Sequence, residues 1–151
     1  MVSSISEQRE RCLSLMHRYA ASLDRRDWAQ WLDLFTEETS YKVITSENFA
    51  KSSLLYLIDE DRGRLKSRCY TYEASPLSKS LHVISNVEPG RNGASDSVPL
   101  AANFLVFRNG QQMFVGEYRM DLAPQGDEMR IRNCLVLLDG LSVLQEIPVP
   151  I

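Results

Sequence analysis

The sequence predicts an α+β fold, with helices in the first part of the chain and antiparallel strands in the rest. Apolar residues first recur at helical spacing, and from Leu81 onward the hydrophobic period becomes two. The dipeptide Asn109-Gly110 between two long alternating runs indicates a two-residue hairpin, since both turn positions need positive φ. We expect residues 1–151 to form one domain, with three helices on one face of a curved antiparallel sheet.

The first two predicted helices form a hairpin. The first covers residues 6–23, and its buried stripe consists of Leu13, Met16, Ala20 and Leu23, widened by Leu15 and Tyr19. Either Asp24 or Asp27 is placed to cap the second helix, because aspartate side chains accept hydrogen bonds from a first turn. The apolar side of that helix carries Trp28, Trp31, Leu32 and Phe35. Residues 36–39 end the hairpin, and 41–44 predict a short strand.

A third helix is predicted over residues 54–68. Its apolar side would carry Leu54, Leu57, Ile58 and Leu65, with Asp61 at the same spacing. The charged residues between them would form an outer face with three arginines, Arg62, Arg64 and Arg68. Such a face is either solvated or an ionic contact with another subunit, in which guanidinium groups pair with carboxylates.

The remaining strands follow from alternation and turn chemistry. They cover residues 81–87, 98–108, 112–122 and 128–138. In the first of these, His82, Ile84 and Asn86 share one face. A bent sheet that closes over helices makes a cone with an open mouth, and His82 would point into it. The apolar, proline-containing tail 141–151 is expected to pack on its own domain or on a neighbouring subunit.

Charge and hydropathy exclude several classes of partner. The formal net charge is −3, which gives no electrostatic reason to bind nucleic acid or an anionic membrane. No apolar run approaches the roughly 20 residues that a membrane-spanning helix needs. Residues 1–10 lack the basic start and apolar stretch of a signal peptide, so we expect a cytoplasmic protein.

The residues that bind redox metals are sparse. The chain holds three cysteines, Cys12, Cys69 and Cys134, which are far apart and are expected to be buried free thiols. It holds two histidines, His17 and His82. A Rieske cluster needs two cysteines and two histidines, and a mononuclear oxygenase iron needs two further histidines and a carboxylate. We therefore expect no metal or cofactor in this chain.

Asp24 and His82 form the one candidate catalytic pair. The turn between the first two helices would bring Asp24 close to His82 inside the cone. A carboxylate beside an imidazole raises its basicity and fixes its tautomer, which suits a general base. The same pair is also consistent with a buried histidine hydrogen-bonded for structural reasons, and both interpretations stay open.

Several blocks of sequence resemble the small (β) subunits of Rieske-type aromatic-ring-hydroxylating dioxygenases. The blocks are Tyr19-Ala-x-x-x-Asp24, Asp27-Trp-x-x-Trp31-Leu-x-Leu-Phe35-Thr-Glu-Glu38, Leu57-Ile-Asp-Glu-Asp-Arg62-x-x-Leu65-x-x-Arg68, His82-Val-Ile-Ser-Asn-Val87, Asn103-Phe-Leu-Val-Phe-Arg108, Phe114-Val-Gly-Glu-Tyr118 and Arg130-Ile-x-x-x-x-Val136. The resemblance implies a cystatin-like cone, the roll shared with ketosteroid isomerase and scytalone dehydratase. The chain departs from the family pattern at Leu81 and Lys79, where relatives commonly carry arginine.

The resemblance also implies a role without an active site. A larger α subunit would carry the Rieske iron–sulfur cluster and the mononuclear iron, and three copies of this chain would form the base of an α3β3 assembly. Arg62, Arg64, Arg68 and Lys79 are the candidate subunit contacts. A stand-alone dehydratase, cyclase or isomerase that uses Asp24 and His82 is the competing hypothesis. A small-molecule binding domain without catalysis is the third.

Overall fold

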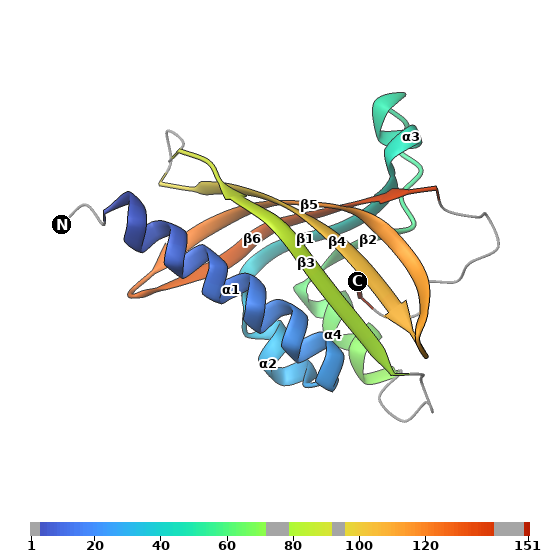
Figure 1. The fold of residues 1–151 in the computed structure, drawn as a ribbon, viewed down its shortest axis with the longest axis horizontal. Coiled ribbons are helices and arrows are strands. Elements are labelled where there is room, and N and C mark those ends of the chain that lie inside the picture. The colour runs from blue at the N-terminus through green and yellow to red at the C-terminus, as the bar shows by residue number, and fades with distance from the viewer. Residues whose placement is uncertain (1–3, 72–78, 92–95, 141–149) are drawn as a thin grey trace.

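Six strands and four helices make up the computed structural model, which describes residues 4–71, 79–91, 96–140 and 150–151. The helices are α1 (Ile5–Arg25), α2 (Trp28–Leu32), α3 (Ser46–Ala50) and α4 (Arg62–Thr71). The strands are β1 (Phe35–Thr45), β2 (Ile58–Asp61), β3 (Ser80–Pro89), β4 (Val98–Arg108), β5 (Gln111–Gln125) and β6 (Glu128–Asp139). Figure 1 shows α1 lying across the curved sheet with α2 and α4 beside its end, whereas α3 stands apart.

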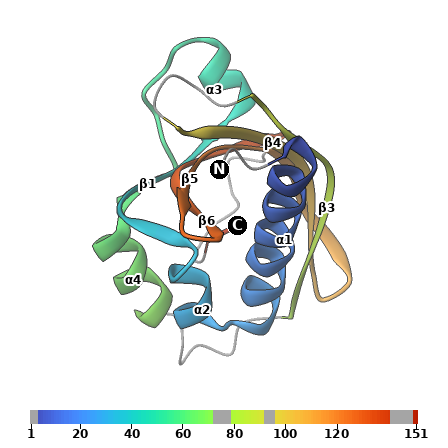
Figure 2. The same cartoon turned by 90° about the vertical axis from the view of Figure 1, so that its left-hand side faces the viewer.

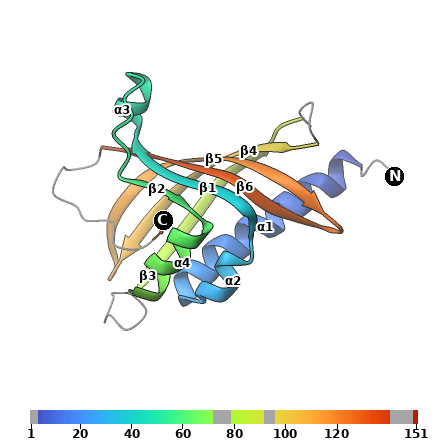
Figure 3. The same cartoon turned by 180° about the vertical axis from the view of Figure 1, so that it is seen from behind.

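The sheet is mixed, which corrects the expectation of a purely antiparallel one. Its strand order is β2-β1-β6-β5-β4-β3, and β1 runs parallel to β6 while every other neighbouring pair is antiparallel. Figure 3 shows β1 between β2 and β6 along the back of the molecule. The parallel pair joins residues about 90 positions apart, for example Tyr41 with Cys134, and no local sequence pattern predicts such a pairing.

Helix α1 begins with a capping box and packs its apolar side against the sheet. The Ser4 hydroxyl accepts a hydrogen bond from the Glu7 N–H, and the Glu7 carboxylate accepts one from the Ser4 N–H. The fully buried residues are Cys12, Leu15, Met16, Tyr19, Ser22 and Leu23. The buried stripe is thus centred on Leu15 and Tyr19, while Leu13 and Ala20 are only half-buried.

The second helix is shorter and the first strand longer than the sequence predicts. Helix α2 ends at Leu32, and Phe35 opens β1 instead of continuing the helix. Asp27 is the N-cap, because its carboxylate accepts a hydrogen bond from the Gln30 N–H at 3.1 Å. Asp24 lies inside α1 and has a different role, described below.

The expected helix over residues 54–68 is wrong in its first half. Residues 58–61 form β2, an edge strand that pairs with β1, and Ile58 lies opposite Val43. The helix starts only after Asp61, whose carboxylate accepts a hydrogen bond from the Arg64 N–H at 2.9 Å. That cap marks the true start of α4, which then buries Leu65 and Cys69.

The long antiparallel strands agree with the alternation in the sequence. Strand β4 has the predicted bounds, and Asn109 and Gly110 adopt φ values of 51° and 77° in the hairpin to β5. In β3, His82 is buried as predicted, but Asn86 is exposed with φ of 52°. The pairing of β3 with β4 shifts register between Ser85 and Glu88, and this bulge reverses the alternation.

The cone encloses a packed aromatic interior. Figure 2 shows α1, α2 and α4 closing the open side of the curved sheet, with the C-terminus inside the ring that they form. Pro150 and Ile151 are buried within this chain, which agrees, for these two residues, with the first of the two expected alternatives, packing on the chain's own domain or on a neighbouring subunit. The rest of the tail, 141–149, and the predicted loop at 72–78 lie outside the described residues.

Candidate functional site

Asp24 and His82 meet inside the cone, as the sequence predicted. Asp24 comes from the last turn of α1 and His82 from the edge strand β3. The imidazole Nδ1 lies 2.6 Å from Asp24 Oδ1, and the His82 backbone N–H donates to both carboxylate oxygens, at 3.0 and 3.1 Å. One carboxylate therefore holds both the backbone and the side chain of His82, and it fixes the ring with a proton on Nδ1.

The other ring nitrogen of His82 is buried without a partner. Within the described part of the chain, Nε2 has no hydrogen-bond partner, and the His82 side chain is 3% exposed. A free Nε2 beside an Asp-bound Nδ1 is the arrangement of a general base. However, neither Asp24 nor His82 lines the surface hollows that the structure describes.

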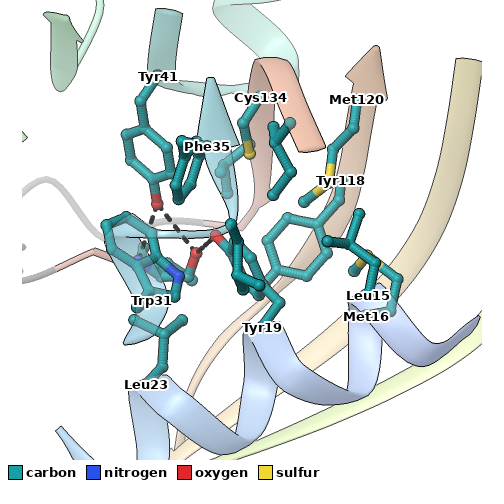
Figure 4. Close-up of a cluster of buried hydrophobic side chains, with 14 of the residues drawn as sticks. Leu15, Met16, Tyr19, Leu23, Trp31, Phe35, Tyr41, Tyr118, Met120 and Cys134 are labelled. Carbon is teal, nitrogen blue, oxygen red and sulfur yellow. Dashed lines mark hydrogen bonds between the residues drawn. The ribbon is translucent and has the colours of Figure 1, made fainter. Parts of the chain in front are cut away.

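Three buried tyrosines, Tyr19, Tyr41 and Tyr118, form the centre of the interior and are called the phenol cluster here. The ring centroids of Tyr19 and Tyr118 are 5.3 Å apart in an edge-to-face arrangement. The hydroxyls of Tyr19 and Tyr41 both donate to the backbone oxygen of Ile151, at 2.5 and 2.9 Å (Figure 4). Burial is the main cause that raises the pKa of all three phenols above the usual value, so they keep their protons.

The cysteines and histidines do not converge on a metal site. Cys12, Cys69 and Cys134 are free, buried and on three different elements, and His17 is exposed on α1. Within the described ranges, no three histidine, cysteine, aspartate or glutamate residues are grouped to hold a metal ion. Burial raises the pKa of Cys12 to about 11 and that of Cys69 and Cys134 to about 12, which disfavours the thiolates that metals require. The residues present therefore do not fit a Rieske cluster or a mononuclear iron.

Two of the four candidate subunit contacts have partners within the chain. Arg68 forms a bidentate hydrogen bond with the Glu60 carboxylate, with Nε 3.0 Å from both oxygens. Arg62 donates to the Leu32 carbonyl at 3.2 Å and lies 3.6 Å from the Glu37 carboxylate. These contacts join the first turn of α4 to α2 and β1 and its last turn to β2.

The other two candidates face solvent. Arg64 is exposed on α4, and its guanidinium has no ion pair or hydrogen bond among the residues that the structure describes. Lys79 is exposed just before β3, and only its backbone carbonyl is used, as the acceptor for the Asn109 N–H at 3.0 Å. Arg64 and Lys79 are thus exposed, whereas Arg62 and Arg68 also have partners within the chain.

Exposed leucines form a surface feature that sequence reasoning missed. Leu54 and Leu55 are 81% and 71% exposed, and Leu57 is 46% exposed, at the entry to edge strand β2. The other edge strand, β3, exposes Leu81 and Val83. The helical interpretation of residues 54–68 had placed Leu54 and Leu57 in a core, and the run Leu54-Leu55-Tyr56-Leu57 was the available signal for a contact surface.

A groove crosses the outer face of the sheet, away from the Asp24–His82 pair. Its volume is about 590 Å³, and residues of β1, β4, β5 and β6 line it. Lys42 lies 4.9 Å above the Tyr56 ring at one side of the groove. Its lining combines outward-facing side chains such as Glu117 and Arg119 with buried residues such as Leu100 and Met120. Separately, no helix among the described residues has the length and apolarity to span a membrane.

Two sequence comparisons relate the chain to known proteins. The sequence profile of a family described as "Ring hydroxylating beta subunit" matches residues 18–145. The small oxygenase component of the p-cumate 2,3-dioxygenase system from Pseudomonas putida is 28% identical, over 84% of this chain and 78% of that protein.

Solved structures extend the likeness to the whole fold. A chain from Novosphingobium aromaticivorans, assigned as the beta subunit of an aromatic-ring-hydroxylating dioxygenase, superposes with a TM-score of 0.87 at 21% identity, covering 99% of this chain and 100% of that one. A Nostoc punctiforme protein of unknown function with a cystatin-like fold gives a TM-score of 0.66 at 13% identity, covering 89% and 93%. The predicted cystatin-like cone is therefore confirmed. Because the family profile matches most of its length, the chain belongs to the ring hydroxylating beta subunit family.

Proposed function

We propose that this chain is a non-catalytic β subunit that supports an iron-carrying α subunit in the oxidation of aromatic compounds. The family match over residues 18–145 carries this proposal. In this assignment the α subunit holds the Rieske cluster and the mononuclear iron, and residues 1–151 act as one α+β unit of an α3β3 assembly. The free buried thiols are consistent with work in the reducing cytoplasm.

The exposed leucines support a role in assembly. Leu54 and Leu55 leave large apolar side chains in water, and adjacent exposed apolar groups mark contact sites in soluble proteins. The exposed Arg64 adds a guanidinium that can pair with a carboxylate of another subunit. The edge strands β2 and β3 also offer unpaired backbone groups for contacts between copies.

Co-expression with an α subunit tests the proposal. The α chain should co-purify with this protein, and light scattering on the complex should give the mass of three copies of each chain. Iron and acid-labile sulfide should appear only in preparations that contain α. Failure of every candidate α chain to co-purify would count decisively against the subunit role.

A pair of matched variants tests the contact surface. Leu55→Lys should prevent co-purification, because it places a charge on an apolar contact. Ile5→Lys is the control, since Ile5 is 90% exposed on the far end of α1 and its replacement should leave the complex intact. Equal effects of the two variants would remove the leucines from the interface.

The Asp24–His82 geometry favours a second candidate function, an acid–base role in a stand-alone dehydratase, cyclase or isomerase. The 2.6 Å contact and the free Nε2 support it. Under this hypothesis, His82→Ala should abolish turnover of a cavity-sized substrate by the isolated chain while its far-UV circular dichroism is unchanged. A variant that only loses stability would argue for the structural role.

A further inference from the structure

Two arginines and a threonine line a hollow where β1 begins. The hollow has a volume of about 480 Å³, and residues of α4, β1, β5 and β6 contribute to it. Arg62 reaches it from the first turn of α4, Arg130 from β6 and Thr36 from the second position of β1. Figure 2 shows α4 and α2 beside β1 in this part of the molecule. The hollow is called the arginine hollow here.

The polar groups of these three residues are incompletely hydrogen-bonded. Arg62 donates to the neutral Leu32 carbonyl at 3.2 Å, and Arg130 reaches the Glu128 carboxylate only at 3.5 Å. Among the described residues, the Nε atoms of both arginines and the Thr36 hydroxyl are buried without a partner. A buried donor without an acceptor is unfavourable. Three polar groups of one hollow therefore lack what a ligand with oxygen acceptors would supply.

The carboxylates of the hollow compensate the two guanidinium charges only weakly. Glu37 lies 3.6 Å from Arg62 Nη1 and Asp33 lies 3.9 Å from Arg130 Nη1, both longer than a hydrogen bond. These two acidic side chains are 88% and 77% exposed, whereas the arginine side chains are 25% and 24% exposed. Water and salt screen ion pairs of this kind, so they contribute little. The buried guanidinium groups thus keep most of their capacity to bind an anion.

We propose that the arginine hollow binds an oxyanion, such as a carboxylate or phosphate group, between Arg62 and Arg130. A guanidinium presents a fork of N–H donors that matches two oxygens of one group, and the Thr36 hydroxyl adds a third donor. Arginine side chains have the rotamer freedom to turn the buried Nε edge toward an acceptor in the hollow. Asp33 and Glu37 would then turn out into water at little cost. This inference goes beyond the subunit role and does not depend on it.

Thermal unfolding of the isolated chain tests the site, with inorganic phosphate and acetate as probes and chloride balancing the ionic strength. At least one probe should raise the melting temperature saturably. Arg130→Gln should weaken that binding at least about tenfold, because it removes a charged donor. Arg64→Gln is the matched control, since Arg64 is exposed on α4 and does not line the hollow. No saturable effect of either probe, or equal loss in both variants, would overturn the proposal.

The source of the oxyanion is read from the complex with a co-purified α subunit. If phosphate still binds to that complex, the site takes a free anion. If the complex no longer binds phosphate and Arg130→Gln weakens co-purification, a carboxylate of the partner chain fills the hollow. Both results keep the oxyanion site, whereas failure of any α chain to co-purify bears on the subunit role alone.

A double variant, Asp33→Asn with Glu37→Gln, separates the binding role from a structural one and serves if Arg130→Gln does not fold. Both residues are exposed, so the double variant should fold. It should bind the probe about threefold more tightly than the original chain, because the competing carboxylates are gone. If the arginines only form ion pairs within the fold, the double variant should instead lose stability and gain no affinity. Unchanged or weaker binding of the probe by the double variant would overturn the proposal.

Discussion

Replacing Asp24 by alanine tests whether the Asp24–His82 pair holds the edge of the sheet. Strand β3 is an edge strand, and on its open side the His82 N–H is satisfied by the Asp24 carboxylate instead of another strand. The variant removes this bond and the 2.6 Å contact with Nδ1 together, and it leaves both donors buried.

The expected loss of stability follows from those contacts. Hydrogen bonds to a charged group contribute about 1.5–3 kcal/mol each, so the two contacts together suggest roughly 3–6 kcal/mol. The Asp24 side chain is 21% exposed, so water can enter after truncation and the lower end, about 3 kcal/mol, is expected. Asp24→Asn should lose about half as much, because the amide oxygen can still accept from the His82 N–H.

Urea unfolding followed by circular dichroism measures these free energies, and amide hydrogen exchange at His82 locates the change. Asp27→Ala is the control in the same turn, since it removes only the cap of α2 and should cost about 1 kcal/mol. If Asp24→Ala loses no more stability than Asp27→Ala, the pair is not an anchor. Unchanged stability with lost turnover in Asp24→Asn would then favour the acid–base hypothesis.

Three further predictions concern the core. Gly116→Ala should lower the free energy of unfolding in urea by about 3 kcal/mol, because a Cβ there would lie 1.9 Å from the Leu137 carbonyl oxygen. Gly63→Ala is the control, since it has room for a Cβ and should not destabilise the protein, and equal results for the two variants would refute the close packing at Gly116. The free energy of unfolding should fall above pH 10 by about 1.4 kcal/mol per pH unit for each member of the phenol cluster, because the unfolded phenols lose protons that the folded phenols retain. A urea midpoint that is unchanged from pH 9 to 11 would contradict this. The three free thiols, with pKa values raised to about 11 or 12, should not react with Ellman's reagent at pH 8 in the folded state and should all react in denaturant; rapid labelling of the native protein would contradict their burial.

The sequence predicts those parts of the fold that local chemistry determines. Strand β4 alternates buried and exposed residues along its length, and the hairpin after it needs the positive φ values that Asn109 and Gly110 adopt. The Asp24–His82 contact was also predictable, although Asp24 lies inside α1 instead of the turn after it, and the face that His82 shares with Ile84 does not extend to Asn86. These features depend on neighbours in the sequence or on one well-marked strand.

The features that were missed depend on distant residues. Residues 58–61 carry three acidic side chains in a row, which suits a charged helix as well as a strand, and only pairing with β1 decides between them. The parallel register of β1 with β6 and the burial of Ile151 between Tyr19 and Tyr41 each join positions about a hundred residues apart. No periodicity within a short window reports contacts of this kind.

The interior polar groups bear on the choice between a supporting role and catalysis in this fold. A cone that performs acid–base chemistry needs an imidazole and hydroxyls that are free to meet a substrate. Here the Asp24 carboxylate is used by the β3 edge, and the Tyr19 and Tyr41 hydroxyls are used by Ile151. Among the described residues, His82 Nε2 and the Tyr118 hydroxyl are the acid–base atoms of the interior that have no hydrogen-bond partner. If removal of Ile151 alone gave the isolated chain a dehydratase or isomerase activity that depends on His82, that result would favour the acid–base role over the supporting one.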